Sequence, residues 1–92
     1  MHDEYAAEKL LKEVLARLQT TLETIQRNRQ NDPRKQAVAW YVKGRTVVGD
    51  EWICRRLEMG SRSNVSRAVN AFRVPEDGVR RGLKTLLHVC AD

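Results

Sequence analysis

Residues 50–73 carry the sequence DEWICRRLEMGSRSNVSRAVNAFR, which predicts two short helices joined by a tight turn. The first covers about residues 51–58, with Asp50 as its N-cap, and the second covers about residues 62–73. Gly60 relieves the backbone in the turn, one or two positions later than in the standard motif. The stretch therefore predicts a helix-turn-helix, which places its second helix in the major groove of duplex DNA.

The second helix of this stretch has one apolar face and one polar face. Val65, Ala68 and Phe72, with Val69 beside them, follow the spacing of a buried helical stripe. The other face carries arginine, asparagine and serine, which donate hydrogen bonds to base edges and phosphate oxygens. With the two serines that are candidate N-caps, the candidate DNA-binding residues here are Ser61, Arg62, Ser63, Asn64, Ser66, Arg67, Asn70 and Arg73.

Three members of this set are the best candidates for contact with bases. Arg62, Asn64 and Arg67 lie in the first turns of the second helix, the part that faces the base edges in this motif. The plainer interpretation is an ordinary polar surface that faces solvent.

Positive charge is concentrated in the same stretch. The preceding helix adds Arg55 and Arg56 as candidates for phosphate contact, and pairing with Glu51 or Glu58 is the alternative. The chain has 17 Lys and Arg against 12 Asp and Glu, a net charge of +5, while its first third is neutral. Arginine makes up most of the basic residues and forms forked hydrogen bonds to phosphate or guanine. This charge favours an anionic partner over a merely solvated surface.

Residues 1–31 form an N-terminal amphipathic segment. A stripe of leucines at steps of four and three predicts a helix from Asp3 to about Leu18. The run Thr20-Thr21-Leu22-Glu23 has the spacing of a capping box, which favours a break and a second helix. One helix to about Asn28 is the alternative, because the apolar stripe continues past the break.

Proline and glycine divide the rest of the chain. In Asn31-Asp32-Pro33 the aspartate caps a predicted helix over residues 34–43, and Gly44 supplies its end. A last helix is expected to begin at Pro75-Glu76-Asp77. No segment alternates apolar and polar residues, so the predicted fold class is all-α, a small domain of five or six helices with a helix-turn-helix core.

Ninety-two residues suffice for a single domain, with its core at residues 32–74 and its C-terminal helix at residues 75–92. No apolar run approaches the roughly 18 to 20 residues needed to cross a membrane, and no leader sequence is visible. Cys54 and Cys90 are too few for a disulfide framework. We therefore expect a cytoplasmic protein with neither a membrane partner nor a small-molecule substrate.

Two motifs carry a resemblance to a known family. One is NDPRK at residues 31–35, and the other is Thr46 followed by WICRRLEMGS at residues 52–61. They are similar to the strings G-D-P-x-K and T-x(5)-W-I-A-x-R-L-x-M-G-[ST]. Those strings occur in the C-terminal helical DNA-binding region of bacterial transposase-like proteins of the REP-associated, HUH-type tyrosine family. The resemblance covers roughly residues 5–70, with asparagine in place of the first glycine and cysteine in place of the alanine.

The resemblance implies a DNA-recognition module that works with a separate catalytic domain or partner. HUH-type nicking needs two histidines separated by one apolar residue, which hold a divalent metal, and a nucleophilic tyrosine. His2 and His88 lie far apart in the sequence, and Tyr5 and Tyr41 are expected to pack within helices. We therefore expect no enzymatic activity, no cofactor and no metal site in this chain.

A protein-interaction or dimerisation module is the alternative function. The N-terminal leucine stripe and the apolar last helix can each pack against a partner, including a second copy of the chain. Duplex DNA is the partner that the arginine-rich helix favours.

Overall fold

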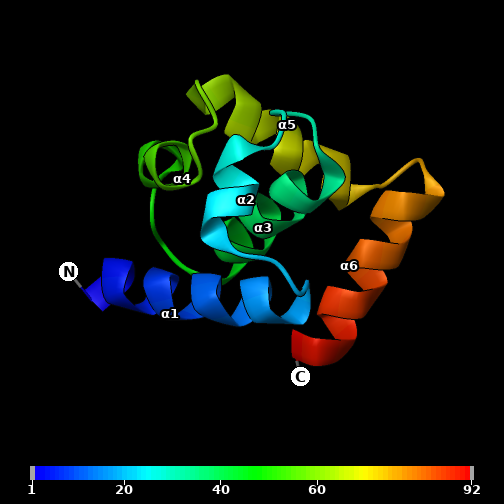
Figure 1. The fold of residues 1–92 in the computed structure, drawn as a ribbon, viewed down its shortest axis with the longest axis horizontal. Helices are drawn as coiled ribbons and strands as arrows, with labels where there is room; N and C mark the ends of the chain where they lie inside the picture. The colour runs from blue at the N-terminus through cyan, green and yellow to red at the C-terminus, as the bar shows by residue number, and fades with distance from the viewer. Residues whose placement is uncertain (1, 92) are drawn as a thin grey trace.

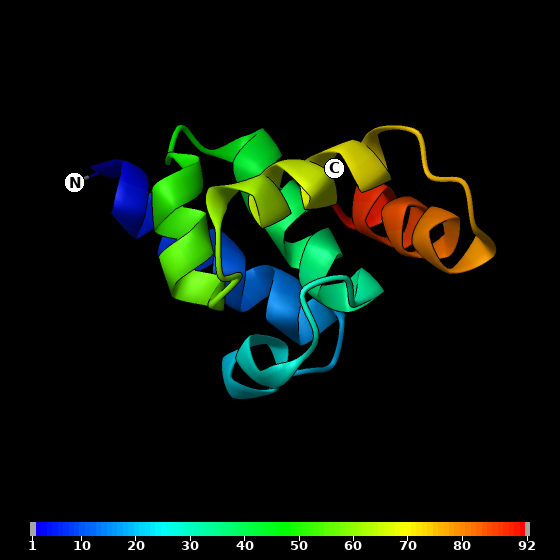
Figure 2. The same ribbon diagram turned by 90° about the horizontal axis from the view of Figure 1, so that it is seen from above.

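The computed structural model describes residues 2–91, with the side chains of residues 4–88. All regular structure in this part of the chain is helical, which confirms the all-α prediction and the expected number of helices. The helices are α1 (His2–Arg17), α2 (Leu22–Arg27), α3 (Pro33–Arg45), α4 (Asp50–Leu57), α5 (Arg62–Arg73) and α6 (Gly78–Ala91). The other five surround α3 and share one apolar core (Figures 1 and 2). None of these helices has the length and hydropathy needed to cross a membrane.

α1 and α2 are separate helices joined by a short loop. Gln19 in this loop has a φ of +55°, which is incompatible with a continuous helix. Thr21 caps α2, because its side-chain oxygen accepts a hydrogen bond from the backbone N–H of Thr24 at 3.2 Å. The predicted break is confirmed and the single long helix is wrong. The capping-box spacing predicts Thr20 as the cap, and the structure places the cap one residue later, at Thr21.

α3 is the central helix. Pro33 is its first residue, and Asp32 caps it by accepting a hydrogen bond from the backbone N–H of Lys35 at 3.0 Å, as predicted. The predicted end at Gly44 is wrong, because this glycine does not take the positive φ of a glycine C-cap. The helix continues to Arg45, and the backbone N–H of its C-cap residue Thr46 donates the last hydrogen bond, to the carbonyl of Val42.

α4 and α5 are joined by a four-residue turn, residues 58–61. Glu58 ends α4 with a left-handed φ of +53°, and Gly60 follows at a φ of +84° that suits glycine. Met59 lies between them and is fully buried, so it anchors the turn to the core. Both helices begin and end within one residue of the predicted positions.

The N-cap of α4 differs from the prediction. Gly49 occupies the cap position without a side-chain hydrogen bond, and Asp50 is the first helical residue. The carboxylate of Asp50 lies 2.8 Å from Nζ of Lys43 at the end of α3. This ion pair draws the carboxylate away from the backbone N–H groups that an N-cap would satisfy.

α6 packs against α3 and α5 and closes the core at one end (Figure 1). It begins at Gly78 rather than at Pro75, because Asp77 is the residue that caps it. The Oδ1 atom of Asp77 accepts a hydrogen bond from the backbone N–H of Arg80 at 2.7 Å. Leu87 is fully buried and anchors the C-terminal half of the helix.

Candidate nucleic-acid interface

The two faces of α5 have different surroundings. Val65, Ala68 and Phe72 are fully buried, and the ring of Phe72 stacks on Trp40 of α3 with the centroids 5.5 Å apart. This contact holds α5 in one orientation and matches the expected apolar stripe. Most of the candidate DNA-binding residues of this helix and its cap are exposed, namely Ser61, Arg62, Ser63, Ser66, Arg67, Asn70 and Arg73.

The arginines of α5 keep an uncompensated charge. Within the part of the chain that the structure describes, no carboxylate lies within ion-pair distance of Arg62, Arg67 or Arg73. The guanidinium of Arg67 donates one hydrogen bond, to the neutral Oδ1 atom of Asn64 at 3.3 Å. The remaining N–H groups are free to form forked hydrogen bonds to phosphate or guanine.

Asn64 is half-buried and its amide is largely occupied. Its Nδ2 donates to the backbone carbonyl of Met59 at 2.6 Å, and its Oδ1 accepts from Arg67. The amide therefore closes the turn and orients Arg67, which leaves one N–H for another partner. Ser61 occupies the N-cap position of α5, as expected, but its side chain makes no capping hydrogen bond.

The two arginines of α4 differ in their contacts. Arg55 is exposed, whereas Arg56 forms a two-pronged ion pair with Glu8 of α1, and Nη2 lies 3.1 Å from Oε2. The hydrogen bond from Arg56 lowers the pKa of Glu8, and the same bond raises the pKa of Arg56. The partner is thus Glu8, and not Glu51 or Glu58 as the local spacing had suggested. The pair joins α1 to α4.

A buried lysine supports the turn before α5. Lys35 is fully buried, and its Nζ donates to the backbone carbonyls of Gln26, Asn28 and Glu58 at 3.0–3.1 Å. Burial lowers the pKa of Lys35, and the negative charges of Glu58 and Asp32 oppose that shift. Because the carbonyl of Glu58 begins the turn, this lysine helps to set the direction of α5.

Two glutamines reinforce the same corner. Gln26 donates from Nε2 to the backbone carbonyl of Arg56 at 2.9 Å, and Gln30 donates to that of Glu58 at 3.2 Å. Together with Lys35 they satisfy carbonyls at the end of α4 that have no partner within the helix.

A small polar hollow lies between the α2–α3 loop and α5. Its volume is about 190 Å³, and it is lined by Gln30, Asn31, Gln36, Asn64 and Arg67. The lining consists of four amides and one guanidinium, without a carboxylate. We call it the amide hollow. Sequence analysis singled out only Asn64 and Arg67 among these residues.

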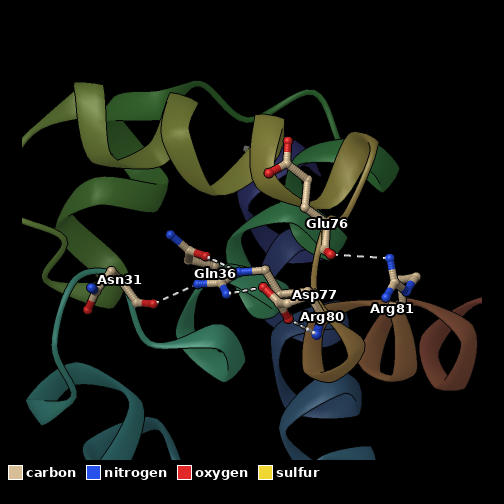
Figure 3. A network of polar contacts seen from close by, with 6 residues as sticks. All are labelled: Asn31, Gln36, Glu76, Asp77, Arg80 and Arg81. Atoms are coloured by element: carbon tan, nitrogen blue, oxygen red, sulfur yellow. Dashed lines mark hydrogen bonds and ion pairs between the residues drawn. The ribbon is translucent and has the colours of Figure 1, made fainter.

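The side chains of the basic residues of α6 donate hydrogen bonds to other parts of the protein. Arg80 donates from Nε to Oε1 of Gln36 at 2.9 Å, from Nη1 to Asp77 at 2.7 Å and from Nη2 to the carbonyl of Asn31 at 2.9 Å (Figure 3). Hydrogen bonds from the backbone N–H and the guanidinium of Arg80 lower the pKa of Asp77. Arg80 therefore ties α6 to α3 and to the α2–α3 loop.

Its neighbours on α6 also bond to backbone carbonyls. Arg81 donates to the carbonyl of Glu76 at 3.2 Å, and Lys84 donates to that of Arg73 at 2.8 Å. The basic residues of α6 thus connect elements of the fold.

Two other expectations concern catalytic residues. Tyr41 packs in the core as expected, but Tyr5 is 76% exposed, so the expectation of packing is wrong for Tyr5. Among the side chains that the structure describes, no three His, Cys, Asp or Glu residues lie close enough to hold a metal ion. The side chains of His2 and Cys90 lie outside the described residues.

Comparison of the chain with protein-family models, with curated proteins and with solved structures gave no match. The candidate interface therefore rests on its own residues and their geometry. Among the residues that sequence analysis missed, Lys35 had a usable pattern, since it lies three residues before Val38 and seven before Val42 on the buried stripe of α3. No sequence pattern points to Gln30, Asn31 or Gln36, because these residues meet α5 only in the folded chain.

Proposed function

We propose that this chain is a DNA-binding module in which α4 and α5 act as a helix-turn-helix. In this proposal α5 lies in the major groove with its polar face toward the bases, and α4 crosses the phosphate backbone. The observation that carries the proposal is the contrast across α5. Its inner face is fully buried, while Arg62, Arg67 and Arg73 are exposed without a carboxylate partner among the described residues.

The contacts of the individual residues suggest a division of roles. Of the three residues expected to contact bases, Arg62 lies in the first turn of α5, and its side chain makes no hydrogen bond within the described part of the protein. We therefore assign base reading to Arg62 rather than to Asn64. The exposed Arg55 and Arg73, in the last turns of α4 and α5, are assigned to phosphates.

A salt titration of duplex binding tests the proposal. About five phosphate contacts predict a log–log slope of affinity against salt near −4 to −5. The affinity of the whole chain for a labelled duplex would be measured by fluorescence anisotropy at several KCl concentrations. An affinity that barely changes between about 50 and about 200 mM salt contradicts the proposal. Selection from random oligonucleotides would then define the preferred site.

We also propose that the module belongs to a transposase-related protein with a separate catalytic domain or partner. The support is the resemblance of NDPRK and WICRRLEMGS, and several motif residues have clear roles in this fold. Pro33 begins α3, Met59 anchors the turn, and Gly60 takes a positive φ. A fused or neighbouring gene for an HUH-type nuclease would support this assignment, and unrelated neighbours would count against it.

A protein-interaction module is the second candidate function, and one feature of α6 favours it. Val79 is 62% exposed and Leu86 is 43% exposed. Both line an apolar groove of about 510 Å³ that also includes Pro33 and Leu83. Sedimentation at two protein concentrations separates the candidates. A monomer that binds DNA supports the first, and self-association without DNA binding supports the second.

A further inference from the structure

We propose that the amide hollow binds a phosphate group of the DNA strand that borders α5. This inference rests on the proposed function and identifies the contact on one flank of the recognition helix. Phosphate oxygens are acceptors with negative charge, so their binding site needs N–H donors and a cation. The hollow supplies four amides and the guanidinium of Arg67, with no carboxylate in its lining.

Gln36 is the most informative member of the lining. It is only 6% exposed, and its Oε1 accepts a hydrogen bond from Arg80 at 2.9 Å. The Nε2 arm of the amide therefore points away from Arg80 (Figure 3) and has no hydrogen-bond partner among the described residues. Nε2 is not sealed from solvent, so it can be reached from the hollow that Gln36 lines. A donor on an otherwise buried amide without a partner suits an acceptor ligand.

The other donors are held in place by the fold. Gln30 and Asn64 each use one N–H on a backbone carbonyl, of Glu58 and Met59 respectively, and keep a second one. Arg67 is oriented by Asn64 and keeps most of its donors. Because these donors are preorganised, binding a phosphate needs little further ordering.

The charge around the hollow supports the same ligand. Arg29, next to the lining residues Gln30 and Asn31 in the α2–α3 loop, is exposed and has no ion pair within the described residues. Asp32 is the carboxylate of this loop, and it is engaged in capping α3 and in a hydrogen bond from Asn28 at 3.2 Å. The α2–α3 loop thus adds positive charge beside α5.

The decisive variant is Gln36→Glu, which keeps an acceptor for Arg80 and replaces the free donor with a negative oxygen. Its matched control is Gln19→Glu, which makes the same change of charge in the α1–α2 loop outside the hollow. We expect Gln36→Glu to weaken duplex binding at least tenfold and to make the salt slope shallower by about 1. The loss should be equal on two duplexes of unrelated sequence, because a phosphate contact carries no sequence information. Thermal unfolding of both variants would show that each one is folded.

The outcomes separate this inference from the proposed function. If the wild-type chain binds duplex DNA and the two variants weaken binding equally, the amide hollow is not a phosphate site and the DNA-binding proposal stands. If the wild type does not bind DNA, the proposed function fails, and inorganic phosphate then tests the hollow alone. A shift of the Gln36 side-chain amide resonance on adding phosphate would support an oxyanion site there. An unmoved resonance would overturn it.

Discussion

α5 and α6 are both amphipathic and basic, but they differ in what their side chains contact. Each helix carries three Lys or Arg residues, which are Arg62, Arg67 and Arg73 in α5 and Arg80, Arg81 and Lys84 in α6. The arginines of α5 face solvent without a carboxylate partner among the described residues, whereas those of α6, with Lys84, all donate to other parts of the protein. The apolar faces differ in the opposite sense. That of α5 is sealed by α3, while Val79 and Leu86 of α6 remain exposed.

The difference lies in the neighbours and not in the residue types. Arg80 meets Gln36, Asp77 and the carbonyl of Asn31 because α6 crosses the start of α3. Within the part of the chain that the structure describes, no comparable set of acceptors bonds to the arginines of α5. A guanidinium whose donors are satisfied within the fold acts as a structural tie, and one whose donors are free can bind an anion. The two helices therefore predict opposite responses to mutation.

The largest expected effect is on the inner face of α5. Phe72→Ala should lower the free energy of unfolding by about 3 to 5 kcal/mol, because it removes a fully buried ring that stacks on Trp40. Leu86→Ala on the partly exposed face of α6 should cost less than about 1.5 kcal/mol. Urea unfolding followed by circular dichroism measures both values. Equal losses would show that the apolar faces of the two helices are equally buried in solution.

DNA affinity should fall when an arginine of α5 is removed and should change less when an arginine of α6 is removed. Arg62→Ala should weaken binding to a preferred duplex by about 1 to 3 kcal/mol if Arg62 reads a base. Arg81→Ala removes the same charge from α6 and is the matched control, because Arg81 bonds to the carbonyl of Glu76. Anisotropy titrations at one salt concentration compare the variants. An equal loss for the two would reduce the effect to net charge, and an unchanged affinity of Arg62→Ala would remove this residue from the site.

Local patterns predicted the fold well because each rested on neighbouring residues. The cap at Asp32, the stripe of Val65, Ala68 and Phe72, and the boundaries of α4 and α5 all follow from spacing within one or two turns. Asp50 was misplaced as a cap because its carboxylate pairs with Lys43 of another helix, which no local pattern contains.

The candidate interface was predictable only in part, for the same reason. Spacing identified which side of α5 is polar, and the exposure of Arg62 and Arg67 agrees with it. Spacing did not reveal that Arg56 pairs with Glu8, 48 residues away in the sequence, or that Gln36 and Arg67 line the same hollow. Those contacts depend on how the helices pack, so the free and the engaged arginines become distinguishable only in three dimensions.

Arg80 tests the structural side of the comparison. Arg80→Met keeps much of the aliphatic stem and removes the hydrogen bonds to Gln36, Asp77 and Asn31. We expect a loss of about 1 to 2 kcal/mol in the free energy of unfolding, because Arg80 is only 20% exposed and the partners lose their donor. Arg62→Ala serves as the control and should change stability by less than about 0.5 kcal/mol. A stable Arg80→Met variant would mean that the contacts of α6 contribute little in solution.

The smallest expected effect concerns Arg56, whose ion pair with Glu8 is partly exposed. Arg56 is thus intermediate between the solvent-facing arginines of α5 and the bonded Arg80 of α6. Glu8→Gln should lower the free energy of unfolding at pH 7 by about 0.5 kcal/mol, because solvent screens a half-exposed pair. Since Arg56 lowers the pKa of folded Glu8, this stability is fully present above the ordinary pKa of glutamate and is lost as pH falls through the lowered value.

The difference between wild type and Glu8→Gln should therefore close as the pH falls through the ordinary pKa of glutamate and then through the lowered pKa of folded Glu8, where Glu8 becomes protonated in the unfolded and then in the folded chain. Urea midpoints measured across this range check the sign. A difference that persists at the acidic end would have to come from a cause other than the ion pair. The variant also frees Arg56 while it raises the net charge by one, so its affinity for duplex DNA should increase slightly at low salt. An unchanged affinity at low salt would show that Arg56 does not reach the phosphates even when it is unpaired, and would restrict the free cations of the proposed interface to α5 and Arg55.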